Sequence, residues 1–211
     1  MKKGRVVTGI EEFDKKRYKI FLDQEFAFVL YKGELAQYQI FEEQIIDEDI
    51  YHLIIDEVLV KRAKKRCLNL LQKKNFTEYK LREKLKEGCY PLEIENNAID
   101  YVKSFGYVDD YRYACDYIFY HKNSESQKKI EDKLKIKGID STIIEQAMVD
   151  SYDNEEAEQM ELEQARKILQ KKNFDAKNMD WKEKQKIYMI LARKGIRGTI
   201  IKKAMMLPDM L

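Results

Sequence analysis

Two spacings of apolar residues divide the chain, a strand-like spacing near the amino terminus and a helical spacing after it. Residues 5–8, 18–22 and 26–29 are short runs of β-branched or aromatic residues, separated by Asp14-Lys15-Lys16 and Asp23-Gln24-Glu25. Runs of this kind between turn residues are typical of antiparallel strands. They predict a sheet of two or three strands, which must pack on a helix to be stable. Residues 31–46 lack a clear period, and we expect a short helix and a loop there.

From Asp49 onward the apolar residues recur at helical spacing. Asp47 or Asp49 can cap a first helix that continues to about Lys74, because either carboxylate can accept from a free helical N–H. Thr77 begins the next helix, and Pro91 suits the first turn of another. Gly106 suits the left-handed position that ends that third helix. The scarcity of proline (2) and glycine (8) in 211 residues agrees with a mainly helical chain.

One pattern of seven residues occurs three times with identical spacing, which indicates an internal repeat. Its copies are Leu81, Leu85, Cys89, Tyr90, Ile94, Ala98 and Ile99; Ile130, Leu134, Gly138, Ile139, Ile143, Ala147 and Met148; and Ile187, Leu191, Gly195, Ile196, Ile200, Ala204 and Met205. The hexapeptide LQKKNF at 71–76 recurs at 169–174, ahead of the first and third copies. Each copy therefore predicts the second and third helices of a three-helix unit.

These patterns predict a mainly α fold: a tandem array of three three-helix, helix-turn-helix-like repeats behind a small antiparallel β element. We expect the β element in residues 1–48 and the repeats in residues 49–106, 107–153 and 154–211. Each unit is smaller than a comfortable domain, so neighbouring repeats should share interfaces, as they do in solenoid arrays. The third repeat carries about eight extra residues, 175–182, and we expect Trp181 to anchor this insertion.

Charge is arranged in blocks, although 40 Lys and Arg against 38 Asp and Glu leave a net charge of only +2. Residues 42–57 and 150–163 each hold seven acids and no Lys or Arg. Residues 61–88 carry a net +8, and residues 164–203 a net +10. Solvated helix faces with i,i+4 ion pairs explain part of this pattern. The basic excess goes beyond what pairing needs, and it can steer a negatively charged partner.

The sequence argues against several other classes of protein. No apolar run is longer than six residues, the length of Phe26–Tyr31, so we expect no membrane span and no signal peptide. Three cysteines (Cys67, Cys89 and Cys115) without a C-x-x-C pair favour reduced, buried thiols in a cytoplasmic protein. The two histidines stand far apart, and no phosphate-binding or nucleophile motif is present. We expect no catalytic activity, no metal and no cofactor.

The junction between the first two repeats resembles a known signature. The residues are Gly106-Tyr107-Val108-Asp109-Asp110-x-Arg112-Tyr113-Ala114, a helix stop followed at once by a helix start. Together with Leu81-Arg82-x-Lys84-Leu85 and the Lys137-Gly138-Ile139 turn, they resemble the RecX family, whose architecture is three tandem three-helix repeats. The resemblance covers about residues 60–206. The chain departs from the family at Cys89, where a glycine is usual, and at Lys122–Ser126, where many members have a basic-Gly-Pro stretch.

The resemblance implies regulation of the RecA recombinase. Family members bind the filament that RecA forms on single-stranded DNA and lower its strand exchange, ATP hydrolysis and co-protease activity, which modulates DNA repair and the SOS response. We therefore expect a cytoplasmic monomer whose partner is this filament, with at most weak direct contact to DNA. The candidate contact residues lie at repeat-equivalent or neighbouring positions, and stacked repeats could align them in a basic ridge: Lys73, Lys74, Lys80, Lys84, Lys171, Lys172, Lys186, Arg193, Lys194 and Arg197.

A second hypothesis is a helix-turn-helix regulator that reads duplex DNA. The expected third helices argue against it, because they carry acids, among them Glu93, Glu95, Glu145 and Asp150, that phosphates would repel. The aromatic residues of the helix after the signature fall on two faces of that helix. Tyr113, Tyr117 and Tyr120 are expected in the core rather than as base-stacking platforms.

Overall fold

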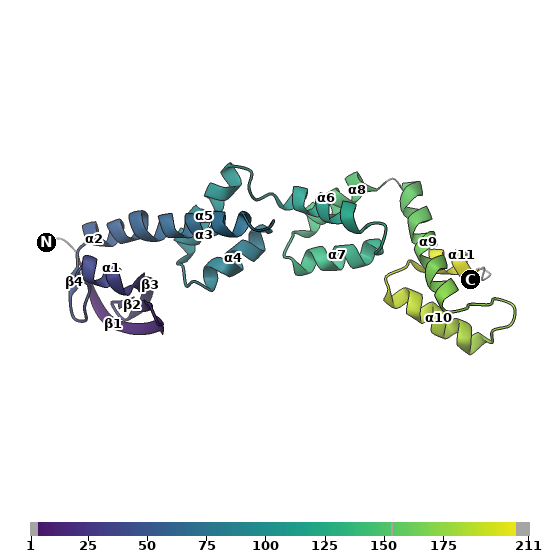
Figure 1. The fold of residues 1–211 in the computed structure, drawn as a ribbon, viewed down its shortest axis with the longest axis horizontal. Helices are drawn as coiled ribbons and strands as arrows, with labels where there is room; N and C mark the ends of the chain where they lie inside the picture. The colour runs from purple at the N-terminus through teal and green to yellow at the C-terminus, as the bar shows by residue number, and fades with distance from the viewer. Residues whose placement is uncertain (1–3, 153, 206–211) are drawn as a thin grey trace. The chain divides into compact units, whose positions relative to one another are not determined.

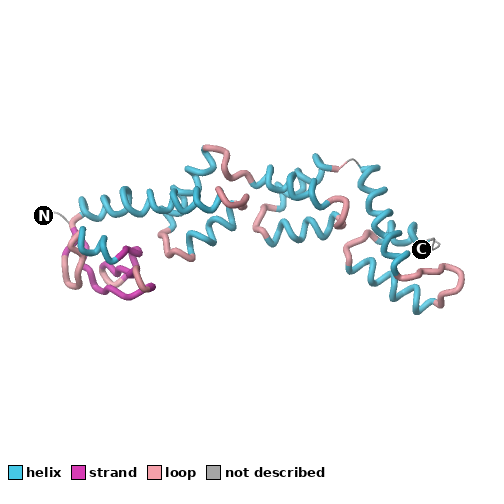
Figure 2. The backbone as a smooth tube through the Cα atoms, in the orientation of Figure 1, coloured by secondary structure: helices cyan, strands magenta, loops and turns pink. Residues whose placement is uncertain are grey.

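The computed structural model describes residues 4–152 and 154–205, which fall into two compact units divided between Asp109 and Asp110 (Figure 1). The first unit holds the β element and the first three-helix repeat. The second unit holds the other two repeats, and residues 206–211 of the expected third repeat lie outside the described residues. The fold is mainly helical with one small antiparallel sheet, as the sequence predicts (Figure 2).

The sheet has the strand order β3-β2-β1-β4. Its strands are β1 (Arg5–Asp14), β2 (Arg17–Leu22), β3 (Glu25–Tyr31) and β4 (Ile45–Ile46). The first turn falls where the sequence predicts it, and the Asp14 carboxylate stabilises it by accepting from the backbone N–H groups of Lys16 and Arg17, both at 3.0 Å. The ambiguous segment forms the short helix α1 (Lys32–Gln37) and a loop, as expected. Strand β4 is additional to the two or three strands predicted. It could not be predicted because two residues are too few to show an alternating pattern.

A continuous helical run then leads from the sheet into the first repeat. It comprises α2 (Glu48–Leu53), the π-helical segment η1 (Ile54–Val60) and α3 (Lys61–Leu71). Of the two aspartates considered, Asp47 is the cap, and its carboxylate accepts from the N–H of Ile50 at 2.8 Å. One core cluster joins sheet residues such as Phe28 to Leu59 of η1 and Leu85 of the repeat. The sheet and the first repeat therefore share one hydrophobic core.

The first repeat is completed by α4 (Glu78–Lys86) and α5 (Leu92–Ser104). Thr77 caps α4, as predicted, and its hydroxyl accepts from the N–H of Lys80. Pro91 is extended and precedes α5 as its N-cap residue, one position before the first turn in which we expected it. Gly106 has the predicted left-handed conformation, with φ +67°. It closes α5 through bonds from Gly106 N–H to the Lys103 carbonyl and from Tyr107 N–H to the Val102 carbonyl.

The second unit contains two further three-helix repeats with separate cores. The second repeat is formed by α6 (Asp110–His121), α7 (Gln127–Ile136) and α8 (Ser141–Ser151), and the third by α9 (Asn154–Lys171), α10 (Trp181–Arg193) and α11 (Gly198–Met205). Buried residues of the second repeat, including Ile130 and Leu134, form one cluster, and those of the third, including Leu191 and Ile200, form another. These two neighbours meet through polar groups, and each keeps its own apolar core.

The same turn follows the middle helix of every repeat. Cys89, Gly138 and Gly195 take φ values of +54°, +79° and +81°. In each case the next residue donates its N–H to the carbonyl of the leucine five positions earlier: Tyr90 to Leu85, Ile139 to Leu134 and Ile196 to Leu191. The seven-residue pattern thus marks a real structural repeat. Cys89 keeps the glycine-type conformation, although a side chain makes that conformation costly.

Two expectations about aromatic residues are wrong. Trp181 is the first residue of α10 and is 57% exposed, so it does not anchor the insertion. The insertion is ordered by two aspartates instead: Asp175 accepts from the N–H groups of Lys177 and Asn178, and Asp180 caps α10. Tyr120 is 76% exposed and lies outside the core. Tyr113 and Tyr117 pack against the core of the second repeat, as predicted.

Candidate partner-binding surface

The candidate cations of the first unit divide into paired and exposed groups. Lys80 donates to Glu83 at 2.7 Å, and this hydrogen bond raises the pKa of Lys80 above its ordinary value. Lys84 pairs at 2.6 Å with Glu87, the residue that follows α4. Lys73 and Lys74 lie exposed in the turn after α3, where the Lys74 ammonium sits 4.9 Å from the centre of the Phe76 ring. Lys73 and Lys74 are therefore the better placed of these four to meet a partner.

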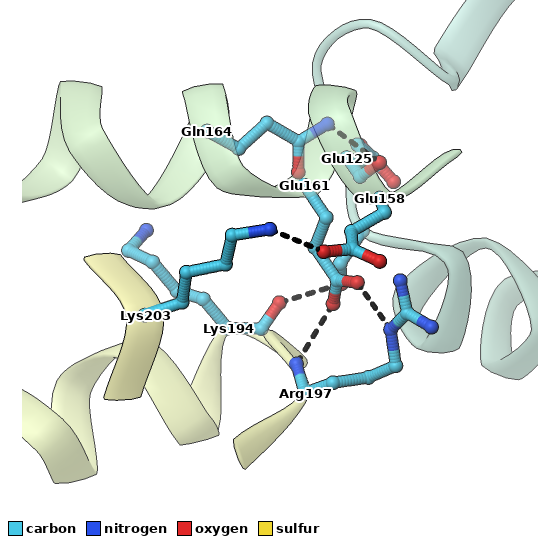
Figure 3. Close-up of polar contacts among 8 residues, drawn as sticks. Glu125, Glu158, Glu161, Gln164, Lys194, Arg197 and Lys203 are labelled. Atoms are coloured by element: carbon cyan, nitrogen blue, oxygen red, sulfur yellow. Dashed lines mark hydrogen bonds and ion pairs between the residues drawn. The ribbon is translucent and has the colours of Figure 1, made fainter. Parts of the chain in front are cut away.

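The candidate cations of the second unit divide in the same way. Lys171, at the end of α9, and its neighbour Lys172 are exposed, as is Lys186 on α10. Arg197 belongs to the third repeat's own structure, because its backbone N–H and its guanidinium both donate to the Glu161 carboxylate. Glu161 is only 4% exposed, so the pair fixes the start of α11 against α9 (Figure 3).

The second and third repeats meet along a polar seam. The Ser126 hydroxyl donates to the backbone carbonyl of Lys194 at 2.7 Å. The Gln164 amide donates to the carbonyls of Lys122 and Glu125, both at 3.1 Å. Figure 3 shows the bond to Glu125. Gly195 sits so close that an added Cβ would come within 2.5 Å of the Ser126 hydroxyl. The glycine of the repeat turn thus has a second role here, which is to let the two repeats approach.

An open cavity of about 340 Å³ lies along this seam. Lys129 on α7 and Lys167 on α9 line it, together with the predicted Arg193 and Lys194 at the end of α10. Glu125 also lines it, and its carboxylate accepts from Lys133 at 2.6 Å. Burial raises the pKa of Glu125, but the bond from Lys133 and the nearby Lys129 outweigh it and hold that pKa below its ordinary value.

Lys129 and Lys167 were missed in the sequence analysis. Lys167 lies inside the basic block 164–203, but its neighbours alone give no sign that it lines a cavity together with Arg193. The Ser126–Lys194 contact, which helps to form the cavity, spans 68 positions in the sequence. One sequence alone could not reveal a pairing over that distance.

The residues of the signature span the junction between the first and second repeats. Gly106 ends α5, Val108 is buried in the first unit, and α6 begins at Asp110. Tyr107 stacks on Phe105, with ring centres 5.8 Å apart. In the second unit Tyr113 stacks on Tyr117, and the Lys137 ammonium lies 5.5 Å from the Tyr113 ring centre. The signature is therefore explained by helix termination and packing, and Asp109, Asp110 and Arg112 all make further polar contacts within the structure.

Within residues 4–152 and 154–205, no group of three or more histidine, cysteine or acidic side chains could hold a metal ion. The same residues include no helix both long and apolar enough to span a membrane. Of the three thiols expected to be buried, Cys67 is buried, whereas Cys89 and Cys115 are only partly buried. Burial raises the pKa of Cys67 to about 11. Such a thiol stays protonated at neutral pH and is a poor nucleophile.

The fold and surface define a class of protein: a tandem array of three-helix repeats with clustered surface charge. Residues 158–205 match the family model described as the third three-helix domain of RecX. The regulatory protein RecX of Clostridium acetobutylicum is 31% identical over 144 residues, 67% of either chain. That of Caldanaerobacter subterraneus is 29% identical over 95% of this chain and 98% of its own. The chain belongs to the RecX family of regulatory proteins.

Solved structures agree with this fold. A crystal structure of regulatory protein RecX matches with a TM-score of 0.62 at 24% identity, covering 94% of this chain and 99% of its own. The crystal structure of RecX from Lactobacillus salivarius matches with a TM-score of 0.60 at 22% identity, over 70% of this chain and 95% of its own.

Proposed function

We propose that this protein is a non-catalytic regulator that binds the RecA filament on single-stranded DNA and inhibits its recombinase, ATPase and co-protease activities. The observation that carries the proposal is membership of the RecX family together with its repeat architecture. Such a regulator would modulate DNA repair and the SOS response. It would act as a cytoplasmic monomer and need no cofactor.

The distribution of charge supports a filament as the partner. Exposed cations such as Lys73, Lys74, Lys171 and Lys172 recur at equivalent ends of the first helices of the first and third repeats. Acidic stretches alternate with these basic ones, as in residues 150–163. A nucleoprotein filament offers a regular series of phosphates and acidic side chains, and a repeated basic surface can meet such a series more than once.

The alternative of a duplex-reading helix-turn-helix regulator finds less support. Glu93 on α5 and Glu145 on α8 are exposed on the helices that would have to enter the major groove. Phosphates on both sides of the groove would repel these carboxylates. Tight, sequence-selective binding of duplex DNA would favour that alternative.

The decisive experiment is ATP hydrolysis by the cognate recombinase on single-stranded DNA, measured with and without this protein. We expect the rate to fall as the protein is added, and the fall to be smaller at higher salt because ionic contacts are screened. An unchanged rate at saturating protein would refute the proposal.

A further inference from the structure

The cavity at the seam of the second and third repeats holds more positive charge than its own carboxylate balances. Four cations line it, namely Lys129, Lys167, Arg193 and Lys194, against the single carboxylate of Glu125. That carboxylate already accepts from Lys133 and lies 3.7 Å from Lys129. Within residues 4–152 and 154–205, the side chains of Lys167, Arg193 and Lys194 make no ion pair. The cavity therefore carries a positive charge that an anion could neutralise.

The backbone adds to this charge. Ser126 is the N-cap residue of α7, but its hydroxyl donates to the Lys194 carbonyl and gives no hydrogen bond to its own helix. Among the residues that the structure describes, the first N–H groups of α7 therefore have no side-chain acceptor, and they lie at the end of the helix where the dipole is positive. Lysines from two repeats and the positive end of α7 would all attract an anionic ligand.

We propose that this cavity binds the phosphodiester backbone of single-stranded nucleic acid, with Lys129, Lys167 and Arg193 as the main phosphate contacts. The inference rests on the proposed function and assigns part of it to a place on the protein. A strand carries one charge per nucleotide, so a short segment brings successive phosphates to the several cations. The guanidinium of Arg193 can hold a phosphate through two parallel hydrogen bonds.

The distribution of charge along α9 favours a single strand over a duplex. Its first ten residues, 154–163, contain five acids and no base, whereas Arg166, Lys167 and Lys171 follow without an acid in residues 164–171. A rigid duplex lying over the cavity would extend across the acidic half and be repelled. A flexible strand can place its phosphates at the basic end alone.

Binding at this place would also hold the two repeats together. Lys129 belongs to the second repeat, whereas Lys167 and Arg193 belong to the third. A strand that contacts all three adds an ionic link beside the Ser126–Lys194 and Gln164 hydrogen bonds. Because the ligand binds only the folded seam, it should raise the melting temperature of the second unit.

The test measures binding of a fluorescein-labelled oligothymidylate of about 15 nucleotides by anisotropy, over a range of salt concentrations. The double variant Lys167→Gln with Arg193→Gln removes two cavity cations. We expect it to bind at least about tenfold more weakly. The slope of log affinity against log salt should fall by roughly 0.7 for each phosphate that the variant no longer neutralises.

A matched control removes two exposed lysines of the same repeat away from the cavity, by Lys177→Gln with Lys182→Gln. A conservative pair, Lys167→Arg with Arg193→Lys, keeps both charges. We expect both controls to bind within about threefold of the unmodified protein, and melting curves to show that all variants fold, since these side chains are exposed. Equal weakening by the control pair would overturn the inference, because it would show diffuse charge attraction, and so would unchanged binding by the cavity pair.

The recombinase ATPase assay separates this inference from the proposed function. Cavity-dependent oligonucleotide binding without any effect on the ATPase would refute the proposed function and leave the phosphate site standing. Loss of inhibition in the cavity variant with unchanged oligonucleotide affinity would overturn the phosphate site, because it would assign the cavity to an acidic protein surface.

Discussion

Glu161 holds Arg197 by two separate groups, the backbone N–H at 2.7 Å and the guanidinium. Arg197 occupies the position that Asp140 occupies in the second repeat, 57 residues earlier. Asp140 caps its own helix, α8, by accepting from the N–H of Thr142 at 2.8 Å. An arginine side chain has no acceptor for a helical N–H. In the third repeat the carboxylate at this place comes from α9, and it binds Arg197 itself rather than an N–H of α11.

Replacement of this carboxylate should weaken the third repeat. We expect Glu161→Gln to lower the free energy of unfolding by about 1–3 kcal/mol, because a buried charge-assisted hydrogen bond becomes a neutral one. Hydrogen exchange of α11 should accelerate at the same time. The control is Glu158→Gln, which breaks an exposed pair with Lys203 and should cost about 0–1 kcal/mol. Equal effects of the two variants would contradict the structural role of Glu161.

The repeat register is tested at Leu134, which is fully buried in the core of the second repeat. Leu134→Asp places a carboxylate in that core and should cost several kcal/mol, about 3 or more. Circular dichroism should show the second repeat unfolded or melting at a much lower temperature. Ile136→Asp is the control, since Ile136 lies two residues on in α7 and is 73% exposed. An unchanged melting curve for Leu134→Asp would show that the register is wrong.

A glutamate replaces the apolar residue at one position of the repeat. Glu95 is 2% exposed, and the equivalent residues Ile144 and Ile201 are buried isoleucines. Its Oε2 atom has no hydrogen-bond partner in the described part of the chain. Burial raises the pKa of this carboxyl above its ordinary value, although Lys86 and Arg82 act in the opposite direction. The folded protein therefore binds this proton more tightly than the unfolded chain does.

The sign of the pH effect follows. Below the ordinary carboxyl pKa, Glu95 is protonated in the folded and the unfolded protein, and its full contribution to the free energy of unfolding is present. This contribution is lost as the pH rises through the raised pKa of Glu95. We expect Glu95→Ile to raise the free energy of unfolding at pH 7 by about 1–2 kcal/mol, with a smaller gain at pH 4. Denaturant titrations at both pH values measure this. Glu95→Gln, which has no charge to titrate, should remove the contribution of this group to the pH dependence while keeping a side chain of similar shape.

Alanine substitutions at Gly195 and Gly106 distinguish the energetic cost of backbone strain from the cost of disturbing the contact between two repeats. Both have a left-handed backbone, but a Cβ at Gly106 would meet no atom within 4 Å, whereas one at Gly195 would meet the Ser126 hydroxyl. Gly106→Ala should cost about 1 kcal/mol from backbone strain. Gly195→Ala should cost more than that, because the seam must also open. Similar costs in thermal unfolding would mean that the approach of the two repeats at Gly195 is not tight.

The basic surface is tested by reversing Lys73, Lys74, Lys171 and Lys172 to Glu, which changes the charge by −8. All four are exposed, so the fold should survive. Inhibition of the recombinase ATPase should fall by about tenfold or more if these lysines meet phosphates or acidic side chains. The matched control reverses Lys15, Lys16, Lys177 and Lys182, which are also exposed and carry the same total charge. Full inhibition by the first variant would place the contact elsewhere.

The repeat could be predicted because it depends on residues that lie close together in the sequence. The positions of Leu85, Leu134 and Leu191 follow from helical spacing, and the glycines that follow two of them mark the turn. The left-handed turn at Cys89 could be expected only by comparison with the other copies. The π-helical segment at Ile54–Val60 could not be predicted, since its extra residue per turn leaves no distinct spacing in one sequence.

The site was less predictable because it depends on contacts between distant residues. Lys80, Lys84 and Arg197 were chosen from charge and repeat position, and the structure shows all three paired with carboxylates. Lys129 and Lys167 were not chosen, yet they line the same cavity as Arg193 and Lys194. The tertiary structure determines whether a cation is exposed and whether it is paired. A count of charges along the chain gives no information on either.

The division of the hydrophobic core has a consequence for how the two halves respond to their surroundings. The first unit joins its sheet and its repeat in one cluster, which gives it the size of an ordinary domain. The second repeat (residues 110–152) and the third (residues 154–205) have separate clusters and meet through hydrogen bonds. The contact between these two repeats depends on a few polar groups, so a ligand that binds both of them can change how strongly they hold together. By mass action, a ligand that binds only the joined repeats stabilises the carboxy-terminal half as one piece.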